Sequence, residues 1–409
     1  MRSRVANPAI VSTASTAMDA ERIVIVGAGP AGLATARSYR EHGGRGAVAL
    51  VGEESLLPYE RPPLTKEFLR GELEEEQLPI ERREWFERHG VDLHLGVSVE
   101  TVESPRGTSR WGKVALGNGK DLEADAIVLA TGSEPIRPPV PGAEQEGTLT
   151  MRRLSDSRAI SAKARAGGEA IVIGSGFIGC EIAGSLAALG VPSTLVSVER
   201  LPQEDRLGAE AAERIAGWLR DAGVTLIGGA SVSSIEDASV VVLDDGRRLR
   251  GACVVLATGV RPRSELAELA ELDRVDGAIA VASTMRSSAP AILAVGDVAL
   301  AHNSAAGRTI RVEHWGDALG HGEVAGRTLA GVRTHWDEVP GFWSTIGRRT
   351  LKYAAWGDGY DESRLIEHGD GTFTVWYARD GATVGVLTHD RDEDYERGRE
   401  RVAAGDPLP

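Results

Sequence analysis

Short apolar runs alternate along the chain with glycine-rich turns and with stretches of helical periodicity. The run Ile23–Val26 leads directly into a glycine turn, then a helical stretch to about His42 and a second apolar run, Ala47–Val51. Strands that are apolar throughout are typical of a parallel sheet covered on both faces. The pattern therefore predicts a βαβ unit with two buried parallel strands.

The turn in this unit carries three glycines with separate tasks. In Gly27-Ala-Gly-Pro-Ala-Gly32, the first makes the tight turn, the second lets the backbone approach a pyrophosphate, and the third lets helix and strand pack closely. The following helix offers free N–H groups and a positive dipole end to phosphates. Glu53 lies 21 residues beyond Gly32, where a ribose-binding acid is expected. This segment predicts a dinucleotide site.

The same pattern recurs about 147 residues later. Ala170–Ile173 leads into Gly174-Ser-Gly-Phe-Ile-Gly179, a helix to about Leu189 and the strand Ser193–Ser197. Two such units predict two bound dinucleotides. The alternative is that one of them is an ordinary glycine-rich turn in a doubly wound sheet.

Three further apolar runs end in small or polar residues where a cofactor can meet the backbone. Ala126–Ala130 is followed by Thr131-Gly132, and Val254–Ala257 by Thr258-Gly259. Ile292–Val295 leads into Gly296-Asp297, at the expected carboxyl edge of a sheet. There Asp297 is placed to accept hydrogen bonds from sugar hydroxyls, or to cap a helix, and the two roles are compatible.

The C-terminal region has a different pattern. Leu365–Leu387 alternates apolar and polar residues around turns at Gly369-Asp370-Gly371 and Asp380-Gly381, which predicts a hairpin-rich sheet. The charged stretch Asp390–Arg401 predicts a surface helix. The fold class is therefore α/β: two Rossmann-like dinucleotide domains plus a smaller α+β C-terminal domain. The expected boundaries are 18–141 with 256–331 for the first, 142–255 for the second and 332–409 for the third, after a disordered tail, 1–17.

Composition narrows the class of protein. The 409 residues carry 46 basic and 60 acidic side chains, a net charge of −14, which argues against a general nucleic-acid binder. The sequence contains no run of about 18 apolar residues, so it does not predict a membrane span. Two cysteines, Cys180 and Cys253, are too few for a disulfide framework or a cysteine-rich metal site, so we expect a cytoplasmic enzyme without a metal.

The string Leu57-Pro-Tyr-Glu-Arg-Pro-Pro-Leu-Thr-Lys66, together with both glycine fingerprints, resembles the two-dinucleotide flavoproteins. Within them, the chain is similar to the ferredoxin reductases of bacterial oxygenase and P450 systems (the putidaredoxin and rubredoxin reductase type), relatives of apoptosis-inducing factor. The resemblance covers roughly 21–344. The chain differs from the disulfide reductases, because no cysteine precedes Cys180. Dithiol–disulfide exchange is therefore excluded.

This resemblance implies roles for individual residues. Glu53 would bind the adenosine ribose of FAD, Arg61 the adenosine or pyrophosphate side, and Asp297 the ribityl chain. Lys66 would lie beside the flavin, held by Glu181, so that its charge stabilises the reduced ring. Arg152 or Arg153 would reach the FAD, with no basis for choosing between them.

Two more motifs complete the implied site. Val312-Glu313-His314-Trp315 matches the start of the last helix of the FAD domain, with Trp315 against the ring or in the core, and Phe342-Trp343-Ser344 matches the opening of the C-terminal domain. The candidate catalytic residues are Lys66 and Glu181. The candidate cofactor-binding residues are Gly27, Gly29, Pro30, Ala31, Gly32, Glu53, Arg61, Lys66, Ala130, Thr131, Gly132, Arg152, Gly174, Gly176, Phe177, Ile178, Gly179, Glu181, Ser197, Arg200, Thr258, Gly259, Gly296, Asp297, Glu313, His314, Trp315 and Trp343.

The end of the second unit departs from the family. NADH-using relatives carry a glutamate 16 residues after the position of Glu181, and Ser197 stands there in this chain. Without that carboxylate a 2′-phosphate is not repelled, and Arg200 is near, although Glu199 beside it offsets its charge. We therefore expect NAD(P)H as donor, with NADPH slightly favoured.

The resemblance implies that NAD(P)H reduces FAD by hydride transfer and that a [2Fe–2S] ferredoxin takes the electrons. Arg348, Arg349 and Lys352 form a basic patch that would dock an acidic ferredoxin, or are simply a solvated face. Two other functions remain open: an NAD(P)H:quinone or diaphorase-type reductase, and a redox-responsive interaction protein like apoptosis-inducing factor. The protein would be a monomer or a homodimer.

Overall fold

The centre of each half of the molecule is a five-stranded parallel sheet. The computed structural model describes residues 20–105 and 111–409. These residues form two compact units, each described here by itself. Unit 1 joins the described residues up to Pro58 with Glu81–Gly132 and Pro262–Glu338, and unit 2 joins Tyr59–Ile80, Ser133–Arg261 and Val339–Pro409.

The parallel sheet of unit 1 has the strand order β20-β7-β1-β2-β3. Because β1 and β7 are apolar almost throughout, both are buried on both faces, and Val24 lies between Ala49 and Ile127 on the neighbouring strands. The predicted βαβ unit is confirmed. The strands are β1 (Arg22–Val26), β2 (Ala47–Gly52), β3 (Val91–Leu95), β7 (Ala126–Leu129) and β20 (Ile292–Ala294).

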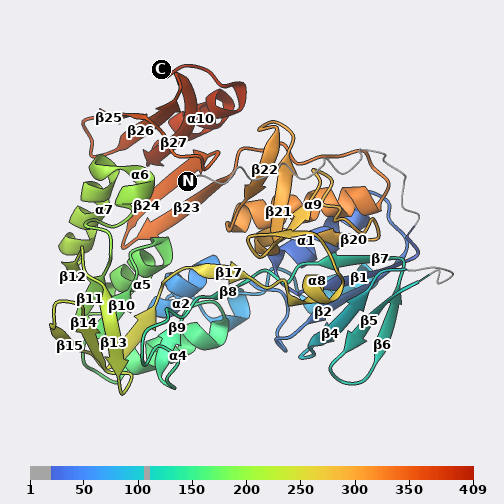
Figure 1. Ribbon diagram of the computed structural model, residues 1–409, viewed down its shortest axis with the longest axis horizontal. Helices are drawn as coiled ribbons and strands as arrows, with labels where there is room; N and C mark the ends of the chain where they lie inside the picture. The colour runs from blue at the N-terminus through green and yellow to red at the C-terminus, as the bar shows by residue number, and fades with distance from the viewer. Residues whose placement is uncertain (1–19, 106–110) are drawn as a thin grey trace. The chain divides into compact units, whose positions relative to one another are not determined.

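Helices α1 (Pro30–Glu41) and α9 (Trp315–Leu329) lie side by side, although about 270 residues separate them (Figure 1). Glycine makes this approach possible. A Cβ placed on Gly322 would lie 2.5 Å from the carbonyl oxygen of Ala31, and one on Gly326 would lie 2.6 Å from the amide nitrogen of Tyr39. The helix of the first fingerprint is thus fixed by the last helix of unit 1.

The rest of unit 1 consists of two smaller sheets and short helices. One sheet has the order β4-β5-β6 and another the order β18-β19-β21-β22, in which the β19–β21 pair is parallel. These elements are β4 (Val99–Glu103), β5 (Gly112–Leu116), β6 (Asp121–Ala124), β18 (Arg274–Val275), β19 (Ala278–Val281), β21 (Ala299–Asn303), β22 (Arg308–Arg311), α3 (Arg83–Arg88), α8 (Glu265–Leu269) and the 3₁₀ turn η3 (Gly296–Val298).

Unit 2 contains the second parallel sheet, in the order β12-β11-β10-β16-β9. Its central strands are entirely buried, as their apolar runs predict. The strands are β9 (Thr148–Thr150), β10 (Ala170–Ile173), β11 (Ser193–Val196), β12 (Val224–Ile227) and β16 (Cys253–Leu256). The helices are α2 (Glu67–Arg70), α4 (Leu154–Arg165), α5 (Phe177–Ala188), α6 (Glu204–Leu207) and α7 (Ala209–Asp221), with 3₁₀ turns η1 (Pro62–Thr65) and η2 (Glu75–Gln77). Smaller sheets are formed by β13 (Val232–Glu236), β14 (Val240–Leu243) and β15 (Arg248–Arg250), and by β8 (Ser133–Pro135) with β17 (Val260–Pro262).

The C-terminal part of unit 2 is an antiparallel sheet in the order β23-β24-β27-β26-β25. The two predicted hairpin turns join its last three strands. One face packs on a charged helix, where Gly398 approaches Val386 and Val402 is buried. The elements are β23 (Gly341–Ile346), β24 (Arg349–Ala355), β25 (Glu362–Glu367), β26 (Phe373–Arg379), β27 (Ala382–His389) and α10 (Asp392–Ala404).

The α/β class with two Rossmann-like sheets is confirmed. The predicted domain boundaries stay a prediction, and the tail 1–17 lies outside the described residues. Among the described residues, no helix has both the length and the apolar character that crossing a membrane requires.

Candidate functional site

The three glycines of the first fingerprint differ in what surrounds them. Gly27 has φ +120°, and a Cβ there would lie 2.1 Å from the carbonyl oxygen of Ala130. A Cβ on Gly32 would lie 2.1 Å from the carbonyl oxygen of Gly27, so helix and turn are in contact. A Cβ on Gly29, the N-cap of α1, meets no atom of the described part of the chain within 4 Å. The backbone is therefore open at the one glycine where a pyrophosphate must approach, and these residues fit a dinucleotide.

The acid after β2 is held near this turn by an arginine. The Glu53 carboxylate accepts from Arg263 Nη1 at 3.0 Å, and the Arg263 carbonyl oxygen accepts from Thr131 Oγ1 at 2.6 Å. Gly132 has φ +68°. Glu53 and the Ala130-Thr131-Gly132 turn thus lie at one edge of the sheet. Arg263 is a residue that sequence reasoning missed, because nothing local indicates a contact across 210 residues.

Asp297 lies at the same edge, on η3 directly after β20. It is buried, and the preceding residue, Gly296, approaches Ala31 of α1. Helix α9 begins at Trp315 with His314 as its N-cap, so the predicted helix start is close to the observed one. His314 Nδ1 lies 2.8 Å from the Asp317 carboxylate, and Glu313 accepts from Arg311 at 2.5 Å.

His321 of α9 is completely buried, and neither ring nitrogen has a hydrogen-bond partner among the residues that the structure describes. Burial lowers its pKa to about 4, against the opposing effect of Asp317 and Asp297. Its ring packs edge-on against Trp336, with 4.5 Å between centroids. Sequence reasoning also missed this histidine, since a single histidine in a helix carries no motif.

The second fingerprint, in unit 2, repeats the geometry of the first. Gly174 has φ +105°, and a Cβ there would lie 2.3 Å from the carbonyl oxygen of Ala257. A Cβ on Gly179 would lie 2.0 Å from the carbonyl oxygen of Gly174, whereas the described atom nearest to one on Gly176 is Gln203 Nε2, at 3.9 Å. The middle glycine is again open, at the N-terminus of the 12-residue helix α5. These residues fit a second dinucleotide.

Polar side chains border this fingerprint. Ser175 Oγ lies 2.6 Å from Ser197 Oγ and donates to the Glu199 carboxylate at 3.2 Å. Arg200 turns to other partners: its guanidinium contacts Glu204 at 2.5 Å and Glu213 at 3.6 Å. The expectation that Glu199 offsets Arg200 therefore needs correction, because other carboxylates neutralise this arginine. Close by, Thr258 Oγ1 donates to the Ile136 carbonyl oxygen at 2.7 Å, and Gly259 has φ +96°.

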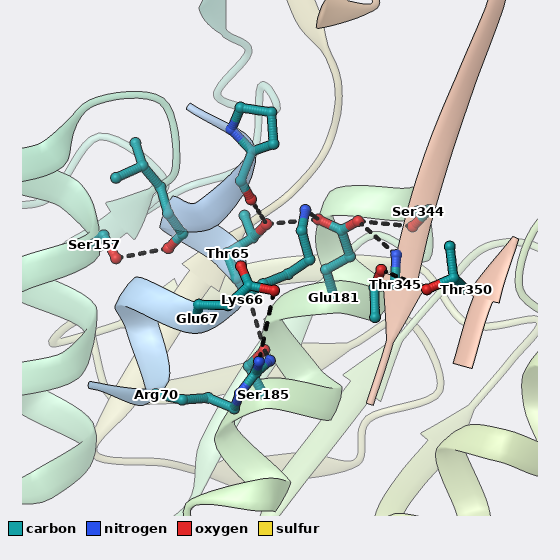
Figure 2. A network of polar contacts seen from close by, with 12 residues as sticks. Thr65, Lys66, Glu67, Arg70, Ser157, Glu181, Ser185, Ser344, Thr345 and Thr350 are labelled. Atoms are coloured by element: carbon teal, nitrogen blue, oxygen red, sulfur yellow. Dashed lines mark hydrogen bonds and ion pairs between the residues drawn. The ribbon is translucent and has the colours of Figure 1, made fainter. Parts of the chain in front are cut away.

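The two candidate catalytic residues meet in a buried polar cluster of unit 2 (Figure 2). Lys66 Nζ lies 3.1 Å from Glu181 Oε2, with side chains only 6% and 5% exposed. The same oxygen accepts from Thr65 Oγ1 at 2.5 Å, and Oε1 accepts from Ser344 Oγ at 2.8 Å and Thr345 N at 3.2 Å. Glu181 therefore receives four donors from two separate segments, and the predicted Lys66–Glu181 pair is confirmed as a contact.

Around this pair, further side chains fix the segment that carries Lys66. Ser157 Oγ donates to the Leu64 carbonyl oxygen at 2.6 Å, and Ser185 Oγ to that of Thr65 at 2.7 Å (Figure 2). Arg70 reaches Ser185 at 3.3 Å. The lysine is thus held from both sides by α4 and α5, a supporting set that spacing along the chain does not indicate.

The predicted arginines lie elsewhere in unit 2. Arg61 Nη1 donates to the Arg152 carbonyl oxygen at 2.6 Å, and its guanidinium lies 5.2 Å from the Tyr59 ring centroid. The backbone N–H groups of Arg152 and Arg153 both donate to Asp156 Oδ2 at 2.8 Å. The structure brings Arg61 and Arg152 together, and it gives no reason to prefer Arg152 over Arg153 as a cofactor ligand.

Aromatic residues connect the second fingerprint to the C-terminal sheet. Phe177, the first residue of α5, packs against Phe342, with ring centroids 4.7 Å apart. Ile178 and Trp343 are large apolar residues that stay exposed, at 46% and 43%.

The predicted basic patch is largely neutralised. Arg349 pairs with Asp221 at 3.2 Å, and Lys352 pairs with Asp392 at 2.7 Å. Arg348 is exposed, and Glu72 lies within its electrostatic reach. The solvated-face interpretation of this segment therefore gains support over the docking patch.

Comparison with known proteins shows which family model and which relatives the chain matches. Residues 21–322 match the model of the pyridine nucleotide-disulphide oxidoreductase family. A probable ferredoxin reductase of Castellaniella defragrans is 31% identical over 396 residues, covering 93% of each chain. A ferredoxin–NAD(P)⁺ reductase of a Sphingomonas species is 32% identical over 397 residues, covering 93% of this chain and 92% of the relative.

The chain is also similar in structure to solved reductases of the same kind. Putidaredoxin reductase, in its covalent complex with putidaredoxin, superposes with a TM-score of 0.88 at 28% identity, over 95% of this chain and 94% of that one. The ferredoxin reductase for the CYP199A2 system of Rhodopseudomonas palustris also gives 0.88, at 27% identity, over 95% of this chain and 96% of the other. Both comparisons cover 95% of this chain, so they extend into the C-terminal sheet.

The cysteines separate this chain from the disulphide-exchanging branch that the family name includes. Cys180 and Cys253 are both free and buried, and burial raises the pKa of each thiol. Electron transfer must therefore run without a redox disulfide. Two fingerprints, the matching family model and the relatives lead to one conclusion: the chain belongs to the pyridine nucleotide-disulphide oxidoreductase family and is an FAD-dependent NAD(P)H oxidoreductase.

Proposed function

We propose that this enzyme passes electrons from NAD(P)H, through FAD, to a small ferredoxin of the [2Fe–2S] type. The observation that carries the proposal is the repeated geometry of the two fingerprints, each with its middle glycine open at a helix N-terminus. FAD binds the first fingerprint, in a domain of 18–141 with 256–331, and NAD(P)H binds the second, in a domain of 142–255. Residues 332–409 form the third domain.

At the first site, the N–H groups that begin α1 bind the pyrophosphate, and Glu53 accepts from the adenosine ribose. Arg263, which contacts Glu53 at 3.0 Å, orients that carboxylate. Asp297 accepts from the sugar-like chain of the cofactor, and Arg61 and Arg152 are further candidate contacts. When bound, FAD supplies the chemistry of accepting hydride from NAD(P)H and releasing electrons to a one-electron carrier.

Lys66 contributes a fixed positive charge. Its ammonium is buried and is held by Glu181, so its position is set before any cofactor is reduced. A preorganised charge of this kind stabilises developing negative charge without reorganisation during the reaction. We therefore propose that Lys66 acts on the flavin and that Glu181 positions it. Lys66→Met should slow reduction of the bound flavin, measured by stopped-flow absorbance, while FAD stays bound.

The names of the relatives support the choice of a ferredoxin partner. Putidaredoxin reductase has been solved in a covalent complex with putidaredoxin, and the Castellaniella relative is named a ferredoxin reductase. We extend this partner class to the present chain, acting as a monomer or homodimer. For the nucleotide, Ser197 slightly favours NADPH, and the environment of that residue is taken up below.

The experiment is cytochrome c reduction by the purified holoenzyme with NADH and NADPH, each with and without a panel of [2Fe–2S] ferredoxins. Strong dependence on one ferredoxin supports the proposal. Rapid oxidation of nucleotide by quinones or dyes, with no ferredoxin adding to the rate, indicates a diaphorase instead. Failure of both nucleotides to reduce the flavin on a catalytic timescale refutes both enzymatic functions.

A further inference from the structure

A carboxylate occupies the border of the second fingerprint, although the expected position holds serine. Ser197 directly follows strand β11, Val198 points outward at 73% exposure, and Glu199 then turns back. Ser175 Oγ donates to Glu199 Oε2 at 3.2 Å, and Ser175 is the residue between Gly174 and Gly176. The Glu199 side chain thus contacts the fingerprint itself.

The position of Glu199 is fixed by several contacts. Its backbone N–H donates to Ser197 Oγ at 3.1 Å, and its second carboxylate oxygen, Oε1, accepts from the backbone N–H of Asp205 at 3.0 Å. Ser197 Oγ and Ser175 Oγ are 2.6 Å apart. The serine that replaces the expected glutamate therefore supports the glutamate two residues later, rather than leaving the strand end without an acid.

Arg200, which follows Glu199 directly in the sequence, is already paired with carboxylates. Arg200 is held by Glu204 and Glu213, on α6 and α7. From Ser197 to Arg206 the chain carries three acids, Glu199, Glu204 and Asp205, against two arginines. In a dinucleotide fold the acid at the end of the second strand accepts from the ribose 2′-hydroxyl, and a phosphate at that position requires an arginine.

We propose that Glu199 selects the nucleotide: it binds the adenosine ribose of NADH and repels the 2′-phosphate of NADPH. This inference rests on the proposed function, in which the second fingerprint binds the pyridine nucleotide. It reverses the slight preference for NADPH that Ser197 alone suggests, because that preference assumed no carboxylate at the strand end.

The test is kcat/KM for NADH and for NADPH with ferricyanide as acceptor, so that no ferredoxin is needed. The wild type should prefer NADH. Glu199→Gln keeps the shape of the side chain and removes its charge, so the ratio of the two kcat/KM values should fall by about 10- to 100-fold, the value of one charge-assisted hydrogen bond. Glu210→Gln removes the same charge from an exposed position on α7, and it should change the ratio by less than about twofold.

Two results overturn the inference: a wild type that prefers NADPH, or a Glu199→Gln ratio that stays within twofold of the wild type. Calorimetric titration of both proteins with NAD⁺ and NADP⁺ gives the same comparison without turnover. If neither nucleotide reduces the flavin but Glu199→Gln still weakens NAD⁺ and strengthens NADP⁺ binding, the proposed function fails and the role of Glu199 stands.

Discussion

For the buried pair Lys66–Glu181, we predict that Lys66→Met changes the stability of the protein in opposite directions depending on whether Glu181 is present. In the wild type, Lys66→Met leaves a buried carboxylate without its counter-charge, and Glu181→Leu leaves a buried ammonium. In the double variant neither charge remains. Lys66→Met should therefore destabilise the wild type but stabilise the Glu181→Leu protein, because it then removes a charge that has no partner.

The expected size follows from the burial of the pair. The side chains are 6% and 5% exposed, so solvent screens the interaction little. Removing one member of such a pair costs about 3–5 kcal/mol. For a unit the size of unit 2, this corresponds to a fall in melting temperature of about 6–20 °C. The double variant should recover part of this loss, since Ser344 and Thr345 still lack their acceptor.

The assay is calorimetric unfolding of the four holoenzymes at one pH and one FAD concentration. The reasoning is refuted if Lys66→Met lowers the melting temperature equally in both backgrounds, since additive effects mean that the two charges do not interact. Flavin reduction kinetics on the same proteins separate stability from function: the double variant should regain stability without regaining the rate of flavin reduction.

Three further predictions follow from other sites. Gly29→Ala should change the melting temperature of the FAD-free protein by no more than about 2 °C, yet it should weaken FAD binding at least about tenfold in a fluorescence titration. Gly32→Ala, in contrast, should destabilise the fold, because its Cβ would lie 2.1 Å from a carbonyl oxygen. Neither Cys180 nor Cys253 should react with a thiol reagent at about pH 8 until the protein is unfolded, because burial raises both thiol pKa values, that of Cys253 to about 11. Burial lowers the pKa of His321 to about 4, so between about pH 6.5 and pH 4 the imidazole binds a proton in the unfolded chain but not in the native state. The free energy of unfolding should therefore fall by about 3 kcal/mol as the pH drops through this range. His321→Leu should flatten that slope in urea unfolding followed by circular dichroism, and an unchanged slope would contradict this assignment.

The parts of the fold that sequence predicts well are those with local causes. The strands of both parallel sheets are continuous apolar runs, and each fingerprint combines a strand, a turn and a helix within about 25 residues. The tasks of Gly27 and Gly32 follow from backbone sterics alone. These features need no knowledge of distant segments, which is why the structure confirms them.

The features that sequence misses depend on distant segments or on a side chain that turns back. The contact of Glu53 with Arg263 spans 210 residues, and no spacing rule indicates it. The sequence shows that Glu199 precedes Arg200, but it does not show the local bend after Ser197. That bend brings the Glu199 carboxylate to Ser175. The Lys66–Glu181 pair came from family resemblance, since periodicity does not bring η1 and α5 together.

The convergence of two distant segments on Glu181 also has a consequence for synthesis of the chain. Both glycine fingerprints and the Lys66–Glu181 pair are encoded before residue 200, but two of the four donors to Glu181 come from Ser344 and Thr345. A nascent chain that stops before β23 can form a nucleotide-binding sheet, yet its central carboxylate lacks half of its hydrogen bonds. The last sixth of the polypeptide is therefore needed to finish a site whose charged residues were translated much earlier.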